Sequence, residues 1–389
     1  MRIKSYFVLP AILFSVFTGG CNSSVKTPSL PPRIYWEEGN FHVQGVAVDV
    51  KRGYVYFSFT TKLVKNDLNG RLVCSVEGMT GHLGCIDINP DDGRVYGSLE
   101  YKNDDIGKGI LIQSENDGDA SITGNPVNAF YIAVFDVDRI TRPGMNVETD
   151  SVLTTVYIND VADDYNATVM NDGRNVEHRY GCSGIDGIAF GPAFGERKGR
   201  YYLHTAYGIY GDTTRTDNDC QVILQYDVSD WEKYEQPLSQ NNPHKNGPEI
   251  PRNKYFVFTG NTAYGIQNLA YDANTGYWFA AVYRGKKRQY PNYPLFTIDG
   301  SQKPDMQPLK GFCNNEKGKI LQLAKAGIYD PKSGIYGWEH KWGSTGIHSL
   351  NNGYFYISQN GISPDKKQYC RLQLYRWTGQ TPDPFEEVK

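Results

Sequence analysis

The chain has 389 residues, and its 40 Lys and Arg against 43 Asp and Glu give a net charge of −3. This balance argues against a surface that binds nucleic acid, and the length suits one large domain or two ordinary ones. The 29 Tyr and 41 Gly indicate strands joined by tight turns.

The N-terminal segment has the pattern of a bacterial export signal. Arg2 and Lys4 precede an apolar stretch over residues 6–17, which is too short to span a membrane comfortably. Two glycines stand directly before Cys21, and this arrangement resembles the lipobox of bacterial lipoproteins. The resemblance implies cleavage just before Cys21 and acylation of that residue, which would give a stable membrane anchor. The alternative is an ordinary secretory signal followed by a chance cysteine.

The residues after Cys21 are polar and rich in proline, which is typical of an extended tether. We therefore expect a signal peptide over residues 1–20, a lipidated tether over residues 21–32 and one domain over residues 33–389. No acidic run follows Cys21, which favours an outer-membrane lipoprotein that faces the periplasm over one displayed on the cell surface. The membrane is then a partner through the lipid anchor, and we expect the protein to be a monomer.

Six further cysteines remain in the mature chain: Cys74, Cys85, Cys182, Cys220, Cys313 and Cys370. The cell envelope is oxidising, so disulfides are one possibility, and six cysteines allow 15 pairings. Buried free thiols are the equal alternative.

Short alternating segments closed by turn residues dominate the rest of the chain. The same small motif precedes five of them: Gly or His, an apolar residue, a polar residue, a small residue and then an alternating apolar run. The five copies have these residues at the equivalent position: Gln44, Gly84, Asp186, Gln267 and His348. A repeated inner strand followed by a hairpin is the unit of a propeller blade, so we predict an all-β β-propeller.

The number of blades is less directly indicated. Only the spacing from Gln44 to Gly84 fits a standard blade of roughly 40–50 residues. The longer spacings fit five four-stranded blades with long insertions, or six to eight blades of which some are degenerate. Between Asp186 and Gln267 we expect one blade with a long insertion over residues 227–254, and this favours five. Its strands are predicted at residues 187–190, 201–207, 221–226 and 255–259.

The two ends of the domain bear on ring closure. Residues 33–37 are expected to supply the outer strand that closes the ring, and residues 371–377 form the last clear strand. The alternative architecture is a pair of β-sandwiches or an irregular two-domain β protein.

The starts of the inner strands converge at the channel mouth of a propeller, so the repeat predicts a shared polar site there. Its members are expected to be His42, Gln44, His82, Asp186, Gln267 and His348. We assign a divalent cation to His42, His82, Asp186 and His348, because imidazole and carboxylate are common metal ligands. His82, Asp186 and His348 are also the predicted catalytic residues, and Gln44 and Gln267 the predicted ligand-binding amides. The alternative is that these side chains bond neighbouring strands and water.

Loops at the blade ends supply a second group of candidates. Glu100 begins a charged segment over residues 100–105, and further polar residues follow second strands or precede inner ones. Arg179 and Tyr210 are predicted catalytic residues, and Glu100, Asp212 and Arg284 are predicted to bind ligand. An Arg fork suits an anionic sugar, and Glu100 paired with Asp186 or Asp212 suits glycoside hydrolysis.

The motifs over residues 42–49 and 184–190 look like those of bacterial secreted propellers of the gluconolactonase-like and six-bladed-repeat type. The resemblance covers the inner-strand pattern. It implies a divalent cation held by acidic and amide side chains, which Asp186 and Gln267 match and the three histidines do not.

Two functions follow from these patterns. One is an envelope hydrolase or lyase acting on a carbohydrate-derived substrate. The other is a non-catalytic propeller that binds a glycan or a partner protein.

Overall fold

The computed structural model describes residues 30–116, 127–311 and 316–389. The predicted signal peptide, Cys21 and most of the tether lie outside the described residues, so the export signal and lipid anchor stay predictions. Within those ranges, no helix has both the length and the apolar character needed to cross a bilayer.

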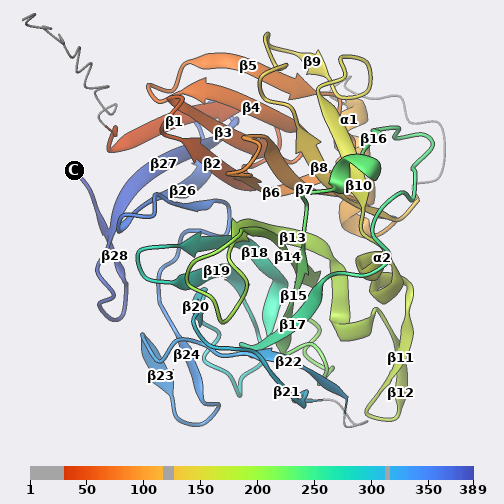
Figure 1. The fold of residues 1–389 in the computed structure, drawn as a ribbon, viewed down its shortest axis with the longest axis vertical. Coiled ribbons are helices and arrows are strands. Elements are labelled where there is room, and N and C mark those ends of the chain that lie inside the picture. Colours follow the sequence, from red (N-terminus) through yellow and green to blue (C-terminus); the bar gives the residue numbers. More distant parts are fainter. Residues whose placement is uncertain (1–29, 117–126, 312–315) are drawn as a thin grey trace, which may run out of the picture.

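The domain is a β-propeller of five blades (Figure 1). Alternating apolar and polar residues form the strands, and each blade begins with an inner strand next to the central axis. Blade one comprises β2 (Gly45–Asp49), β3 (Tyr54–Phe59), β4 (Lys62–Asp67), β5 (Leu72–Glu77) and the short β9 (Met145–Asn146). Blade two comprises β6 (His82–Ile88), β7 (Val95–Tyr101), β8 (Ala129–Phe135), β10 (Leu153–Tyr157) and the short β16 (Gln236–Pro237).

The remaining blades differ more in their outer strands. Blade three comprises β13 (Cys182–Gly191), β14 (Tyr202–Ile209), β15 (Cys220–Tyr226), β17 (Asn253–Phe258), β22 (Lys317–Leu321) and β21 (Asp305–Pro308). Blade four comprises β18 (Thr262–Asp272), β19 (Tyr277–Arg284) and β20 (Leu295–Asp299). Blade five comprises β25 (Ile347–Ser349), β26 (Tyr354–Ile362), β27 (Gln368–Trp377), β1 (Arg33–Glu38) and β28 (Phe385–Glu387).

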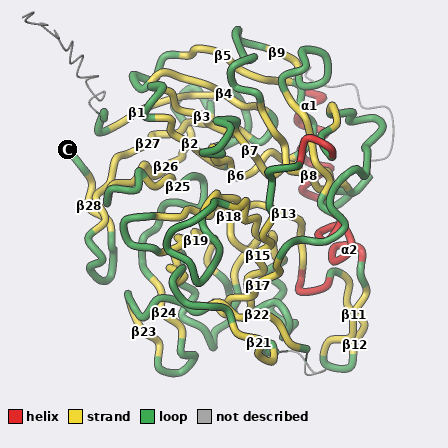
Figure 2. The backbone as a smooth tube through the Cα atoms, viewed as in Figure 1, coloured by secondary structure: helices red, strands yellow, loops and turns green. Residues whose placement is uncertain are grey.

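Hairpins, helices and 3₁₀ turns lie outside the five blade sheets. Two hairpins, β11 (Thr168–Asn171) with β12 (Arg174–Glu177) and β23 (Ile328–Asp330) with β24 (Ile335–Gly337), form separate two-stranded sheets. The helices α1 (Asp105–Asn116) and α2 (Asn159–Asn166) lie on one side of the molecule (Figure 2). Two single 3₁₀ turns complete the set, η1 (Arg179–Gly181) and η2 (Trp231–Lys233).

The predicted ring closure is confirmed. The N-terminal β1 pairs antiparallel with β27 along its whole length, from Arg33 opposite Gln373 to Glu38 opposite Gln368, so the first and last parts of the domain share one sheet (Figure 1). The four predicted strands of blade three are present as β13, β14, β15 and β17. Its long insertion crosses to the neighbouring blade, where β16 pairs with β10.

The core lies between the blades. Each of the four clusters of buried apolar side chains joins residues of neighbouring blades, and the cluster around Val46 and Tyr356 links blade one to blade five. The five described cysteines, Cys74, Cys85, Cys182, Cys220 and Cys370, are buried free thiols, whereas Cys313 lies outside the described residues. Burial raises the pKa of these thiols, which fits a packing role.

Bulges interrupt three of the five inner strands. The pairing register shifts between Leu83 and Ile86 in β6, between Ile185 and Ile188 in β13, and around Ile266 in β18. In contrast, β2 and β25 pair regularly with their neighbours. Since a bulge redirects the side chains at its position, β6, β13 and β18 present their residues of the repeat differently from β2 and β25.

Candidate functional site at the channel mouth

A pocket of about 240 Å³ opens where the inner strands begin. Four blades contribute to its lining, and the apolar residues Ile106 and Ile110 of α1 add to it. The polar lining residues are His42, Gln44, Thr60, His82, Glu100, Lys102, Ser183, Asp186 and Gln267, and the aromatic ones are Phe41, Tyr264 and Tyr283. We call this space the mouth pocket.

Three of these side chains form a compact donor set. His82 of β6, Glu100 of β7 and Asp186 of β13 each place one nitrogen or oxygen atom within 4.8 Å of the other two. The Nδ1 atom of His82 lies 3.7 Å from Glu100 Oε1 and 3.6 Å from Asp186 Oδ1. That Nδ1 atom is buried and has no hydrogen-bond partner. A buried nitrogen left unpaired between two carboxyl groups is costly unless something binds there.

Backbone geometry holds Glu100 in this position. Its Oε2 atom accepts a hydrogen bond of 3.0 Å from the Ile185 backbone N–H across the blade boundary. Gly184, just before it, has a positive φ of 117°, and a Cβ atom there would lie 1.8 Å from Glu100 Oε2. The glycine of the repeated motif is therefore needed both for its backbone conformation and for the space that the carboxyl group occupies.

Lys102 supplies the positive charge beside the donor set. Its Nζ atom lies 2.5 Å from Glu100 Oε1 and 3.6 Å from Asp104 Oδ2, and it donates a 2.8 Å hydrogen bond to the Ser183 carbonyl. Asp104 accepts a hydrogen bond from the Gly107 backbone N–H and so caps the N-terminus of α1. The same residue thus links the helix to the charges of the mouth pocket.

Burial dominates the electrostatics of the site. It lowers the pKa of His82 to about 3, with a smaller contribution from Lys102, so the imidazole is neutral at pH 7. Burial raises the pKa of both Glu100 and Asp186, against the opposing effect of Lys102. Burial alone would lower the pKa of Lys102, but the carboxylates of Glu100 and Asp104 raise it above its ordinary value.

The other predicted mouth residues lie around this set, with one exception. Gln267 donates a 3.0 Å hydrogen bond from Nε2 to Asp186 Oδ2, Gln44 donates one of 3.1 Å to Thr60, and His42 lines the pocket. The prediction that His348 joins them is wrong. It lies in a different cavity, where its Nδ1 atom is 3.8 Å from Asp87 Oδ1.

The reason for this error lies in the bulges. Asp186 and Gln267 occupy skipped positions of bulged strands, whereas His348 stands directly opposite Tyr356 in the regular pairing of β25. Equivalent positions in the sequence repeat therefore do not point in equivalent directions.

Of the loop residues that were predicted to be functional, Glu100 belongs to the donor set and Tyr210 reaches it indirectly. The Tyr210 hydroxyl donates a 2.7 Å hydrogen bond to Asp104, which in turn faces Lys102. The pairing of Glu100 with Asp186 is confirmed as a spatial one, since both belong to the set with His82.

Arg179, Asp212 and Arg284, which were predicted on blade-end loops, do not line the mouth pocket, and their catalytic and ligand-binding roles stay predictions. Arg179 faces Asp164 of α2 at 3.6 Å, and Asp212 accepts hydrogen bonds from the backbone and side chain of Thr214. Arg284 pairs with Glu339. Each is held by local partners at the end of its own segment.

Sequence reasoning missed Lys102 and Asp104, although both stand in the charged segment that begins at Glu100. The alternation of side chains along a strand could have identified Lys102. It is two residues from Glu100, so both side chains project from the same face of β7 and its extension. The sequence does not show which blade this face meets.

Comparisons with known proteins add no family. No family model and no curated protein matches the chain. Among solved structures, the WD40 repeats of RRP9 align with a TM-score of 0.32 at 9% identity, over 88% of this chain and 97% of that one. A Bacteroides caccae protein of unknown function aligns with a TM-score of 0.30 at 12% identity, over 70% and 91% of the two chains. Structural similarities this weak do not indicate a function for this protein.

Proposed function

We propose that this protein is an envelope lipoprotein whose propeller binds a carbohydrate-derived ligand at the mouth pocket, through a divalent cation held by His82, Glu100 and Asp186. The observation that carries the proposal is the meeting of these three donors, from two blades, within 4.8 Å of one another. The motif around Cys21 supports the envelope location.

Charge supports the cation. Around the mouth pocket, the carboxylates of Glu100, Asp186 and Asp104 face the single ammonium group of Lys102, while burial keeps His82 neutral. Burial favours the neutral forms of Glu100 and Asp186 by raising the pKa of both groups, and a bound cation would favour their ionised forms. With all three carboxyl groups ionised, two negative charges remain, and one divalent cation balances them. A cation would also give the unpaired His82 Nδ1 atom a partner.

The donor chemistry narrows the choice of metal. One imidazole nitrogen with two carboxylate groups suits zinc or manganese better than calcium, which prefers oxygen ligands alone. The gluconolactonase-like pattern of acidic and amide ligands is therefore not reproduced, because His82 takes part here.

The rest of the mouth pocket fits a sugar-sized ligand. Tyr264 and Tyr283 add aromatic surface, and Gln44 and Gln267 place amide groups in the lining. Aromatic surface beside convergent polar groups is typical of sites for small organic ligands. Hydroxyl or carboxylate oxygens of a sugar derivative are suitable further ligands for the cation.

The first test is metal binding to the purified mature protein, after chelator treatment, by calorimetric titration with Zn²⁺, Mn²⁺ and Ca²⁺. We expect one cation per chain, with Zn²⁺ or Mn²⁺ preferred, and a loss of at least about tenfold in affinity in Glu100→Gln. The matched control is Glu386→Gln, on the exposed outer strand β28. Equal affinity in Glu100→Gln and wild-type protein would contradict the proposal.

The second test is a panel of neutral, amino and uronic acid oligosaccharides, screened with and without the preferred cation. Cation-dependent retention of an intact glycan supports binding, and appearance of shorter or unsaturated products identifies a hydrolase or a lyase. No cation-dependent interaction with any member of the panel would contradict the carbohydrate assignment.

A further inference from the structure

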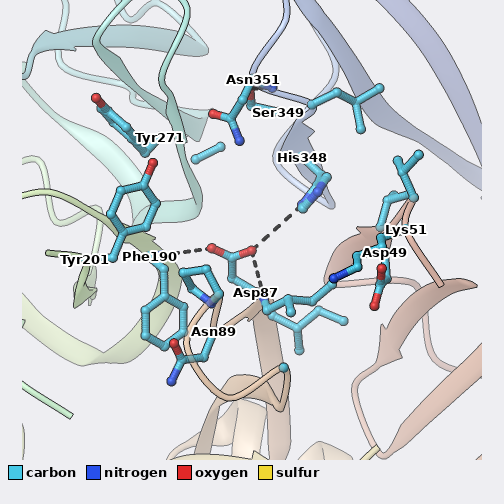
Figure 3. Close-up of a pocket in the computed structure, with 18 of the residues that line it drawn as sticks. Asp49, Lys51, Asp87, Asn89, Phe190, Tyr201, Tyr271, His348, Ser349 and Asn351 are labelled. Atoms are coloured by element: carbon cyan, nitrogen blue, oxygen red, sulfur yellow. Dashed lines mark hydrogen bonds and ion pairs between the residues drawn. The ribbon is translucent and has the colours of Figure 1, made fainter. Parts of the chain in front are cut away.

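A second and larger cavity, of about 550 Å³, lies where the inner strands end. Inner strands of all blades run in the same direction from the mouth pocket, so this cavity occupies the opposite end of the channel. The inner strand of each of the five blades contributes a residue to its lining: Asp49 from β2, Asp87 from β6, Phe190 from β13, Tyr271 from β18 and His348 from β25. Figure 3 shows these side chains around a common space. We call it the far cavity.

Asp87 is the charged centre of the far cavity. Its Oδ2 atom accepts a 2.8 Å hydrogen bond from the Phe190 backbone N–H, and its Oδ1 atom accepts one of 2.8 Å from the N–H of Ile88 (Figure 3). The His348 Nδ1 atom lies 3.8 Å from Oδ1. These contacts fix the carboxyl group between two blades and leave it facing the cavity.

No full positive charge balances this carboxylate. Burial raises the pKa of Asp87 to about 6, against the opposing backbone hydrogen bonds, so the group is mostly ionised at pH 7. Burial lowers the pKa of His348 to about 4, so the imidazole facing it is neutral. Among the described residues, no Lys or Arg lies within ion-pairing distance of Asp87. A partly buried carboxylate without a cation favours a ligand that brings one.

The charged residues that line the rest of the far cavity also favour a positively charged ligand. Asp92 is paired with Arg94 at 2.9 Å, and the remaining carboxylates, Asp49, Asp87 and Asp91, outnumber Lys51 and Arg52, so the lining is net negative. Arg52 is already shared between Asp49 at 3.7 Å and Asp138 at 3.5 Å.

Aromatic rings form one wall of the far cavity. Tyr201, Tyr271 and Phe190 stand together on one side of Asp87, and Asn351 and Ser349 lie across the space from Phe190 (Figure 3). Aromatic faces beside a carboxylate attract an organic cation through the ring quadrupole. The amide and hydroxyl groups of the opposite side offer hydrogen bonds to a polar body.

We propose that the far cavity is a second ligand site, which binds a small polar molecule through a protonated amino group placed at Asp87 beside the tyrosine rings. The site is separate from the mouth pocket and needs no metal ion. It does not depend on the function proposed for the mouth pocket.

The test is binding of paired probes to the chelator-treated mature protein, so that the mouth pocket does not contribute through a metal. The amines are D-glucosamine, putrescine and ethanolamine, and their uncharged counterparts are D-glucose, 1,4-butanediol and ethylene glycol. We expect saturable binding of at least one amine, with its counterpart at least about tenfold weaker. Binding of none of the amines, or equal binding within every pair, would overturn the proposal.

Variants then locate the binding. Asp87→Asn keeps the size of the side chain and one acceptor oxygen, and it should weaken amine binding at least about tenfold, whereas Asp305→Asn on the exposed β21 should not. Should Asp87→Asn fail to fold, Tyr201→Leu removes one ring of the wall without changing the carboxylate and should also weaken binding. Amine binding of wild-type strength in a folded Asp87→Asn protein, or in Tyr201→Leu where that variant is the one tested, would contradict the assignment.

Discussion

At the residue scale, the mouth pocket depends on a glycine as much as on its charged groups. Gly184 leaves the space that the Glu100 carboxyl group fills, and the next residue donates the backbone hydrogen bond that holds this group. Gly265 and Gly346, the corresponding glycines of the repeat, also have positive φ values. The repeated glycine was visible in the sequence, but its role as a cradle for a side chain from another blade was not.

We predict that Gly184→Ala weakens cation binding at least about tenfold, because the new methyl group displaces the Glu100 carboxyl group. The strained φ should also lower the free energy of unfolding by about 1–3 kcal/mol. Metal titration and chemical denaturation measure the two effects. The matched control is Gly144→Ala, since Gly144 has a φ of 71° and nothing within 4 Å of the added carbon. Cation affinity that is unchanged in Gly184→Ala would show that the cradle is not required.

At the element scale, the sequence predicted where the strands lie, but not which way the side chains of the inner strands point. The inner strands and the four strands of blade three are where their alternation placed them. Bulges in β6, β13 and β18 shift the pairing register within their blades, and the alternation in a single sequence does not show where such shifts fall. This explains why Asp186 and Gln267 were assigned correctly to the channel mouth and His348 was not.

The closing strand β1 gives a testable element. Ile34 is buried between β27 and blade one, whereas Tyr35 of the same strand points outward and is 46% exposed. Ile34→Ala should lower the free energy of unfolding by about 2–4 kcal/mol, because it leaves a cavity at the junction of the first and last blades. Tyr35→Ser should cost less than about 1 kcal/mol, as usual for an exposed position. Equally small losses in the two variants would show that β1 is not an integral part of the ring.

At the scale of the whole molecule, five inner strands running in one direction give the channel two chemically different ends. The mouth pocket has the carboxyl groups of Glu100 and Asp186 beside His82 and Lys102, and the far cavity has the Asp87 carboxylate beside aromatic rings. The sequence predicted one axis lined by the repeat. It did not predict two sites, because the order of blades around the ring and the depth of each side chain arise only from the closed fold.

The divalent cation that we propose for His82, Glu100 and Asp186 can be observed directly. The most direct measurement is anomalous X-ray diffraction from crystals of the mature protein soaked with Mn²⁺ or Zn²⁺. We expect one strong anomalous peak in the mouth pocket, within bonding distance of His82 Nδ1 and of oxygens of Glu100 and Asp186. We expect no such peak in Glu100→Gln crystals. A mouth pocket without a peak, or a peak that persists in Glu100→Gln, would contradict it.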